Sequence, residues 1–423
     1  MKEITIALMY VFRQFAKFFS GPYSTTLAGN IDPFYLFGVL YVLRERRKKR
    51  IIEAFVVIGV LASYSLLQFL VLDQLNVQKL LINVIKIFIC YLVFRYAVDN
   101  AHRFDGGKII FSTTAVFTVL TLIALIFSKS DCFWRFNDLV NNFTQTRLQL
   151  FYLEPSELGY HLLLIMLPLG GIFMLSKKRG VKIVSAALIL INGLILYLAM
   201  PMGAIAIGGV AAVGMIFYDF ILRPNKNKIK VYQILFVIGF LVMWVLVYIG
   251  NPLVMRVIFT LMGEDASSNY RVGLSFEVLK QSLVDYNFIG CGFGNQNTEQ
   301  FIGKYSDLGM VQVVVNSFIY FIIETGILGI IVVGAIIITL IRKSVKDKSL
   351  IKMGLSVFII IYSFLGGHFT SALTWIAYGV ICSKIKDEDI VEHFEKMYEY
   401  LKENLYEKRL KPVLVRKSRG KVE

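Results

Sequence analysis

The feature that most constrains this chain is a succession of apolar segments, each about as long as a bilayer is thick. A helix needs about 20 mostly apolar residues to cross the hydrocarbon core. By that measure the 423-residue chain contains about twelve candidate spans. They lie at about 4–20, 25–43, 51–72, 78–98, 109–128, 157–175, 182–200, 203–222, 231–250, 313–341, 350–367 and 369–384. The sequence therefore predicts an all-α fold, a polytopic transmembrane bundle, in which the long segment 313–341 is tilted or begins outside the membrane.

The composition agrees with lipid as the solvent of most of the chain. Apolar residues make up 57% and charged residues 17%, whereas a soluble domain is nearer half apolar. The net charge of +16 does not indicate nucleic acid binding, because the Lys and Arg residues lie between spans, where they set topology. We expect membrane lipids, and no nucleic acid, around this protein.

The polar connections between spans alternate in charge. Four of them carry between four and six basic residues, and such connections belong in the cytoplasm: 44–50, 176–182, 223–230 and 342–352. Two longer, less basic loops, 129–156 and 251–312, then lie outside, and both termini lie inside. We therefore predict a multi-pass protein of the cytoplasmic (inner) membrane with two large extracytoplasmic loops that contain short amphipathic helices.

A charged tail follows the last span and divides the chain into a membrane domain, 1–384, and a cytoplasmic segment, 385–423. Its apolar residues recur at helical spacing, which predicts an amphipathic helix that lies on the membrane surface, followed by a basic tail. The acidic run Asp387–Asp389 in this tail is interpreted as a solvated charge run and not as a metal site.

The first outer loop leads into a span through the sequence TRLQLFYLEPSELGYH, residues 146–161. Pro155 at a first helical position, followed by Ser156 and Glu157, predicts a helix start. Glu154 then has two interpretations, a partner of the helix dipole or a functional carboxylate at the membrane edge. Arg147 at the same edge needs a partner of its own, which favours a role in binding.

The second outer loop contains SSNYRVGLSFEVLKQSLVDYNFIGCGFGNQN, residues 267–297. Arg271 stands at the start of a predicted amphipathic helix that lies on the membrane surface. A turn with Gly290, Gly292 and Gly294 follows, and its exposed backbone N–H groups are suited to an anion. The alternative is a flexible turn before the chain returns to the membrane.

Three further polar residues lie in or near later spans. Glu324 falls in the middle of one, where an ionisable group indicates either function or a buried partner such as an arginine or a tyrosine. His161 and His368 lie near span ends, where a hydrogen-bonded polar residue is more frequent than a catalyst.

These features together resemble a family, the Wzy-type polysaccharide polymerases and the related O-antigen ligases. The order is many spans, an R…EPS start of a mid-chain span, a large outer loop with an arginine-led helix and a GxGxG turn, and an N…EGILG span. The residues that carry the resemblance are Arg147, Glu154, Pro155, Ser156, Arg271, Gly290, Gly292, Gly294, Asn316, Glu324, Gly326 and Gly329.

The chain departs from that pattern at two places. O-antigen ligases carry a histidine immediately before the asparagine that matches Asn316, and here that position is Val315. The family also often has Ser-Arg before Gly-Ala in an earlier span, where this chain has MPMGA, residues 200–204. The first departure favours a polymerase over a ligase, and the second removes one expected cation.

The resemblance implies a metal-independent glycosyltransferase that needs no cofactor. An acceptor sugar hydroxyl attacks the anomeric carbon of a glycan on polyprenyl diphosphate, and polyprenyl diphosphate leaves. The implied catalytic residues are Arg147 and Arg271 for the diphosphate charge and Glu154 or Glu324 as the base. The implied substrate-binding residues are Ser156, Arg256, Gly290, Gly292, Gly294 and Asn316.

The partners that follow from the resemblance are polyprenyl-diphosphate-linked oligosaccharides, together with a flippase and a chain-length regulator. Three alternatives stay open. A ligase would move the finished glycan to another acceptor, a flippase or other transporter would move it without a covalent step, and a peptidoglycan polymerase of similar topology would use a cell-wall precursor. The long outer loops and the absence of repeat symmetry in the sequence disfavour the transporter.

Overall fold

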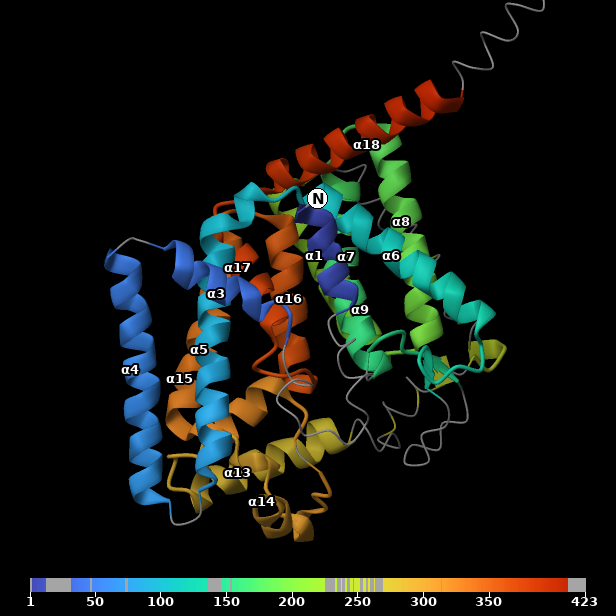
Figure 1. Ribbon diagram of the computed structural model, residues 1–423. Helices are drawn as coiled ribbons and strands as arrows, with labels where there is room; N and C mark the ends of the chain where they lie inside the picture. Colours follow the sequence, from blue (N-terminus) through green and yellow to red (C-terminus); the bar gives the residue numbers. More distant parts are fainter. Residues whose placement is uncertain are drawn as a thin grey trace, which may run out of the picture.

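The computed structural model describes residues 2–12, 32–45, 48–72, 75–135, 146–152, 154–224, 269–312 and 314–409, with isolated positions between 233 and 262. Within these residues the chain is a bundle of helices with one pair of short strands (Figure 1). The predicted all-helical membrane architecture is confirmed at this level, since several of the helices are apolar enough to cross a membrane.

Seven of the described helices are long and apolar enough for a span. They are α4 (Lys48–Val71), α5 (Val77–Asn100), α6 (Gly106–Ile126), α7 (Pro155–Leu175), α8 (Arg179–Ala199), α9 (Met202–Leu222) and α15 (Ser317–Lys346). Shorter apolar helices are α3 (Tyr35–Arg44), α16 (Leu350–Leu365) and α17 (Ala372–Cys382), and α1 (Lys2–Val11) packs beside α6. The expected number of about twelve spans is thus not confirmed, and the segment expected at 231–250 lies mostly outside the described residues.

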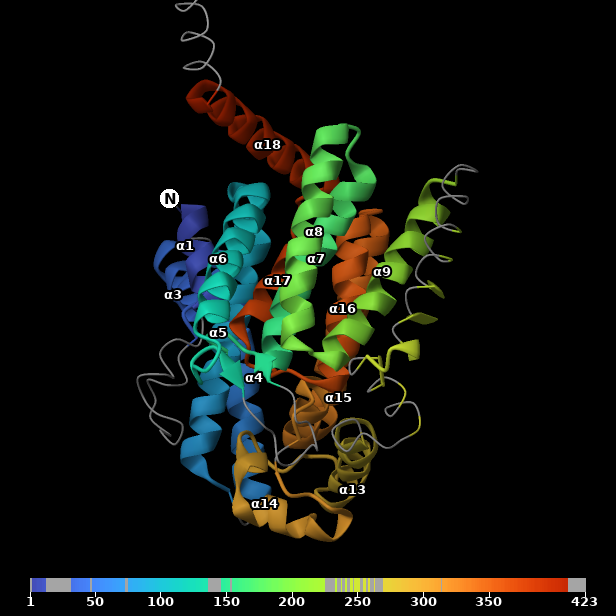
Figure 2. The same cartoon turned by 90° about the vertical axis from the view of Figure 1, so that its right-hand side faces the viewer.

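The described residues of three basic connections, 44–50, 176–182 and 342–352, lie at one end of the bundle, which we call the basic end (Figure 1). Arg50 pairs there with Asp99 at 3.0 Å, and Lys178 pairs with Glu395 at 3.4 Å. The C-terminal helix α18 (Asp387–Arg409) lies across this end, and α13 (Ser275–Asp285) and α14 (Glu299–Lys304) lie at the opposite end, the loop end (Figures 1 and 2).

Helix α18 is amphipathic, as the sequence predicts, but protein and not lipid covers part of its apolar face. Phe394 is 1% exposed, and its backbone lies against Gly107 at the start of α6. The Tyr398 ring lies against Gly180 at the start of α8. The helix therefore fastens α6, α7 and α8 together at the basic end.

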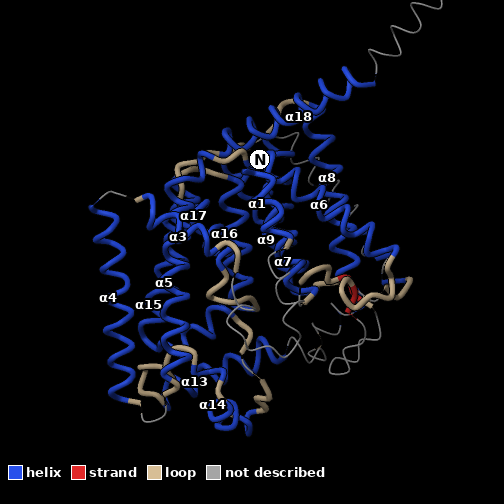
Figure 3. The backbone as a smooth tube through the Cα atoms, viewed as in Figure 1, coloured by secondary structure: helices blue, strands red, loops and turns tan. Residues whose placement is uncertain are grey.

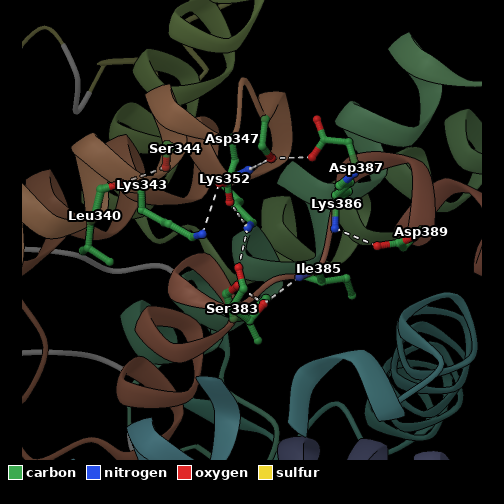
Figure 4. A network of polar contacts seen from close by, with 12 residues as sticks. Leu340, Lys343, Ser344, Asp347, Lys352, Ser383, Ile385, Lys386, Asp387 and Asp389 are labelled. Carbon is green, nitrogen blue, oxygen red and sulfur yellow. Dashed lines mark hydrogen bonds and ion pairs between the residues drawn. The ribbon is translucent and has the colours of Figure 1, made fainter. Parts of the chain in front are cut away.

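A buried polar network joins α15, α16 and α18 at the same end (Figure 4). The ammonium of Lys352, 1% exposed, lies 2.5 Å from Asp347 and donates to the Ser383 carbonyl at 2.9 Å. Asp387, interpreted above as solvated, is instead 4% exposed, accepts a hydrogen bond from Ser349 and holds the Leu350 N–H at 2.7 Å. That part of the acidic run was wrongly assigned, because the carboxylate caps the first turn of α16.

The two long loops differ in structure. In the described part of the first loop, β1 (Trp134–Arg135) pairs antiparallel with β2 (Arg147–Leu148), shown in red in Figure 3, and no helix is present there. The second loop contains the π-helical turn η3 (Tyr270–Leu274), α13, η4 (Asn295–Asn297), α14 and η5 (Ser306–Leu308). It packs on the first turns of α15 around a small core of its own: Val278, Cys291, Phe301, Tyr305, Met310, Val314, Ile319 and Ile323.

Candidate functional site

A cavity of about 140 Å³ lies where the second loop meets the bundle. It is bounded by the start of α7, the turn η3, the end of α16 and the connection 366–371 that leads into α17. We call it the junction pocket, and its lining is Glu154, Ser156, Glu157, Tyr160, His161, Arg271, Val315, Tyr362, Gly366, Gly367, His368, Ser371 and Thr374. Charged and hydroxyl groups from segments far apart in the sequence thus converge on one small space.

Arg271 brings a positive charge to the pocket from the π-helical turn η3, a kind of turn that is frequent at functional sites. Its Nη1 lies beside Gly366, 3.4 Å from where a Cβ on that residue would stand. Within the described part of the chain its one hydrogen bond is a long one, 3.5 Å to the Leu365 carbonyl. The guanidinium therefore keeps donors for a ligand.

Asn316, a predicted substrate-binding residue, contacts the backbone of Arg271 on the side away from the pocket. Its Nδ2 donates to the Arg271 carbonyl at 2.6 Å and to the Phe364 carbonyl at 2.7 Å. The side chain is fully buried, so it faces the protein and not the pocket. Asn316 thus ties η3 to the end of α16 and positions Arg271 without touching the cavity.

The neighbouring Tyr270 anchors the same turn. Burial raises the pKa of its phenol above the ordinary value, so the hydroxyl stays protonated and donates to the Gln312 carbonyl. The first two residues of the turn, Tyr270 and Arg271, are therefore tied to Gln312 and Asn316.

The start of α7 brings two carboxylates to the pocket. The helix begins at Pro155, as the sequence predicts, and Glu154 stands exposed immediately before it. Its Oε2 accepts a hydrogen bond from Ser156 Oγ at 2.9 Å. Tyr362 of α16 donates to the Ser156 carbonyl at 3.4 Å, which joins the start of α7 to α16. Glu157, in the first turn of the helix, lines the same cavity.

The connection 366–371 supplies the third wall, and with it His368, a residue that our site prediction did not include. Ser371 N–H donates to the His368 carbonyl at 3.0 Å, and Gly367 has a φ of +82°, a conformation that favours glycine. The signal in the sequence was the pair of glycines before this histidine between two apolar segments, GGHFTS. From the sequence, His368 was interpreted as a hydrogen-bonded polar residue near the end of a span.

Arg147 lies elsewhere. Its Nε and Nη2 donate to the carbonyls of Ala199 and Met200, both at 3.3 Å, at the end of α8. A cation at this position satisfies the last carbonyl groups of a helix and complements the helix dipole. The partner that the sequence required is therefore a helix C-terminus, and the structure does not bring Arg147 to the junction pocket.

The glycine turn is packed into a break of α15. At Gly326 the backbone of that helix leaves the helical conformation, with φ +55° and ψ −128°, and a Cβ there would stand 1.9 Å from the Phe288 carbonyl oxygen. Cys291 N–H donates to the Ile323 carbonyl and Gly292 N–H to the Glu324 carbonyl, at 3.0 and 3.1 Å. Gly290 thus permits close contact with the backbone of α15, and the N–H groups of Cys291 and Gly292 are used within the protein.

Helix α4 satisfies backbone groups that the break leaves open. Gln68, fully buried, donates to the carbonyls of Ile289 and Glu324 at 3.0 and 2.8 Å. Tyr64 donates to the Thr325 carbonyl at 2.8 Å. Irregular backbone at membrane depth is tolerated only where protein groups satisfy it in this way.

Glu324 is 2% exposed and lies on the protein side of this turn. The backbone N–H groups of Gly294 and Gln296 and the Tyr320 hydroxyl face its carboxyl group, although Oε1 has no hydrogen bond of good geometry within the described residues. The group held by the turn is therefore the protein's own Glu324 carboxyl group. Neither Glu324 nor Gly290, Gly292 or Gly294 lines the junction pocket.

Of the ten predicted site residues, the structure brings Glu154, Ser156 and Arg271 together at the pocket. Arg256 lies outside the described residues. Within the described part of the chain, no group of three or more His, Cys, Asp and Glu side chains is arranged to hold a metal ion. Comparison of the sequence with protein-family models finds no match, and comparison with curated proteins finds none either.

The arrangement has a clear chemical capacity. A guanidinium with free donors can bind a phosphate or diphosphate in a bidentate manner, and the nearby carboxylates can orient sugar hydroxyl groups. The small cavity between them keeps these charges partly away from bulk water, which strengthens their interactions with a ligand.

Proposed function

We propose that the protein is a membrane glycosyltransferase that polymerises polyprenyl-diphosphate-linked oligosaccharides at the outer face of the cytoplasmic membrane and releases polyprenyl diphosphate. The observation that carries this proposal is the junction pocket, where Arg271 faces Glu154 and Glu157 at the loop end of an apolar bundle. A substrate that is part lipid and part sugar needs such a site, at the level where apolar helices give way to polar loops.

Arg271 has the central role in this proposal. The leaving group gains negative charge as the bond from the anomeric carbon to the phosphate oxygen breaks, and preorganised donors stabilise that charge. Asn316 and the π-helical turn hold the arginine in place before the substrate arrives. Glu154 and Ser156, whose side chains share a hydrogen bond of 2.9 Å from Ser156 Oγ to Glu154 Oε2, are placed to contact sugar hydroxyl groups.

An apolar groove supports a lipid-linked substrate. It has a volume of about 380 Å³ and lies among α4, α5, α15 and α17. Phe369 and Trp375 line this groove, whereas the residues immediately before them, His368 and Thr374, line the junction pocket. A diphosphate in the pocket would therefore have an apolar path for its isoprenoid chain on the other side of the first turn of α17.

The test is a reaction with purified protein in lipid bilayers and a polyprenyl-diphosphate oligosaccharide as the sole substrate. We expect a ladder of longer glycans and release of polyprenyl diphosphate. Arg271→Ala should lower the rate by about 10²–10³-fold, the usual cost of one donor to a developing negative charge. Lys280→Ala is the matched control, since Lys280 lies exposed in α13 beyond the pocket and should leave the rate unchanged.

The same experiment separates the alternatives. Transfer of the glycan only to a different added acceptor would indicate a ligase. Movement of the oligosaccharide across the bilayer without chain extension would indicate a transporter and contradict the proposal. Full activity of Arg271→Ala would contradict the role of that residue.

A further inference from the structure

Two histidines line the junction pocket, and their surroundings differ. His161 is fully buried, and the rings of Tyr10, Tyr152 and Tyr160 surround it at centroid distances of 5.4, 5.0 and 5.5 Å. Its imidazole is therefore packed among aromatic rings. His368, in contrast, is exposed at the pocket and belongs to a connection between two helices.

The connection that carries His368 is held from several sides. Tyr35 of α3 donates to the Thr370 carbonyl at 2.8 Å, and Trp375 of α17 donates to the Phe369 carbonyl at 2.6 Å. Asp32 accepts from the Ala372 N–H at 3.2 Å. Since its backbone is fixed in this way, His368 is presented to the pocket from a preorganised support, as a catalytic group requires.

His368 also lies close to Arg271, the residue that we predict to bind the diphosphate. Arg271 Nη1 lies against Gly366, two residues before the histidine, and both Arg271 and His368 line the same cavity of about 140 Å³. A sugar whose anomeric phosphate is bound by Arg271 would therefore place its reacting carbon within the space that the imidazole faces.

The titratable and charged groups that face His368 across the pocket come from each wall. They are Glu154, Glu157, Tyr160 and His161 at the start of α7, Arg271 in η3, and Tyr362 in α16. The two carboxylates favour an imidazolium once it forms, and the guanidinium opposes it. Among these groups a histidine is the natural proton acceptor near neutral pH, since its ordinary pKa is about 6.5 and that of a glutamate about 4.3.

We propose that His368 is the general base of the glycosyl transfer, an inference that rests on the proposed function. An imidazole nitrogen takes the proton of the acceptor hydroxyl while the hydroxyl oxygen forms a bond to the anomeric carbon of the donor. The bond from that carbon to the phosphate oxygen breaks, and its electron pair leaves with polyprenyl diphosphate. The imidazolium then returns its proton to solvent.

Val315 fits this assignment. It occupies the position at which the resemblance to ligases would place a histidine, and it lines the same pocket as His368. The pocket thus has an imidazole, but the connection between α16 and α17 supplies it, and not the segment before α15.

The test uses the full-length protein in lipid bilayers, with polyprenyl-diphosphate oligosaccharide as the substrate. We expect His368→Ala and His368→Gln to lower the rate of chain extension by about 10²–10⁴-fold, the usual contribution of a general base. The wild-type rate should fall as the pH drops from neutral into the acidic range, where a general-base histidine becomes protonated, and this acidic limb should disappear in both variants. Added imidazole should restore part of the activity of His368→Ala and none of that of Arg271→Ala.

The control is His102→Ala, which removes an exposed histidine at the opposite, basic end and should leave the rate and its pH profile unchanged. Binding of polyprenyl diphosphate alone should be the same in wild type and both His368 variants, which also shows that the variants are folded. If the His368 variants extended chains at the wild-type rate, the assignment of His368 would be overturned. The same holds if a variant were slower but kept the acidic limb of the pH profile and gained no activity from added imidazole. A wild type that never extends chains would overturn the proposed function itself.

Discussion

The polar regions at the two ends of the bundle differ in how their charges are satisfied. At the basic end, Lys352 has Asp347 and Ser383 as partners, and Asp387 has Ser349 and Leu350 (Figure 4). At the junction pocket, Arg271 makes one hydrogen bond of 3.5 Å within the described residues and faces a cavity. Loss of one partner from a buried ion pair destabilises a fold, whereas a charge held in place with free donors is available to a ligand.

The largest effect that would test this contrast is expected at Asp347. The ammonium groups of Lys352 and Lys343 outweigh the effect of partial burial and lower the pKa of this carboxyl group, so it is ionised at neutral pH. Asp347→Asn leaves the Lys352 ammonium buried without its counter-charge, which should cost about 3 kcal/mol or more of stability. The measurement is the melting temperature of the protein in detergent.

The double variant Asp347→Asn/Lys352→Met is the control for that experiment. A well-packed apolar side chain in place of the ammonium should recover much of the lost stability. If Asp347→Asn instead abolished chain extension by a protein that remained folded, the separation between a structural basic end and a functional pocket would fail.

The break of α15 gives the next largest effect. Gly326→Ala places a Cβ 1.9 Å from the Phe288 carbonyl oxygen at a positive φ, and we expect it to cost at least about 2 kcal/mol. Gly334→Ala in the same helix is the matched control, since its Cβ meets no atom within 4 Å, and it should be neutral or stabilising by up to about 1 kcal/mol. Equal stability of the two variants would show that the glycine turn does not need this close contact.

The smallest effect concerns the second predicted arginine. Arg147→Ala removes the cation at the end of α8 and should lower stability by about 1 kcal/mol, with little change in the rate of chain extension by the folded protein. Arg271→Ala should instead lower the rate of chain extension with little change in stability. A loss of activity in Arg147→Ala as large as that in Arg271→Ala would mean that the diphosphate contacts both arginines.

Local patterns in the sequence predicted much of this structure. Segment length located most of the long helices, the proline of EPS marked the start of α7, and the excess length of 313–341 corresponds to the broken helix α15. Apolar runs and turn residues act over a few neighbours, so one sequence is enough to detect them.

The composition of the pocket was harder to predict because it depends on contacts between distant segments. Nothing near Arg147 in the sequence shows that the end of α8, about fifty residues later, supplies its partners, and nothing near Glu324 shows that Gly294 and Gln296 face it. The place of His368 in the pocket was not predicted for the same reason. Its proximity to Arg271 arises only when Asn316 joins η3 to the end of α16.

Helix α18 also has a consequence for the order in which the molecule can assemble. The starts of α6, α8 and α16 are synthesised before the residues of α18 that contact them, which are Phe394, Tyr398 and Asp387 respectively. During translation these helices are therefore inserted while their contacts at the basic end are still missing. The bundle becomes locked only after α18 has left the ribosome, so maturation is a late, post-insertion event carried out from the aqueous side.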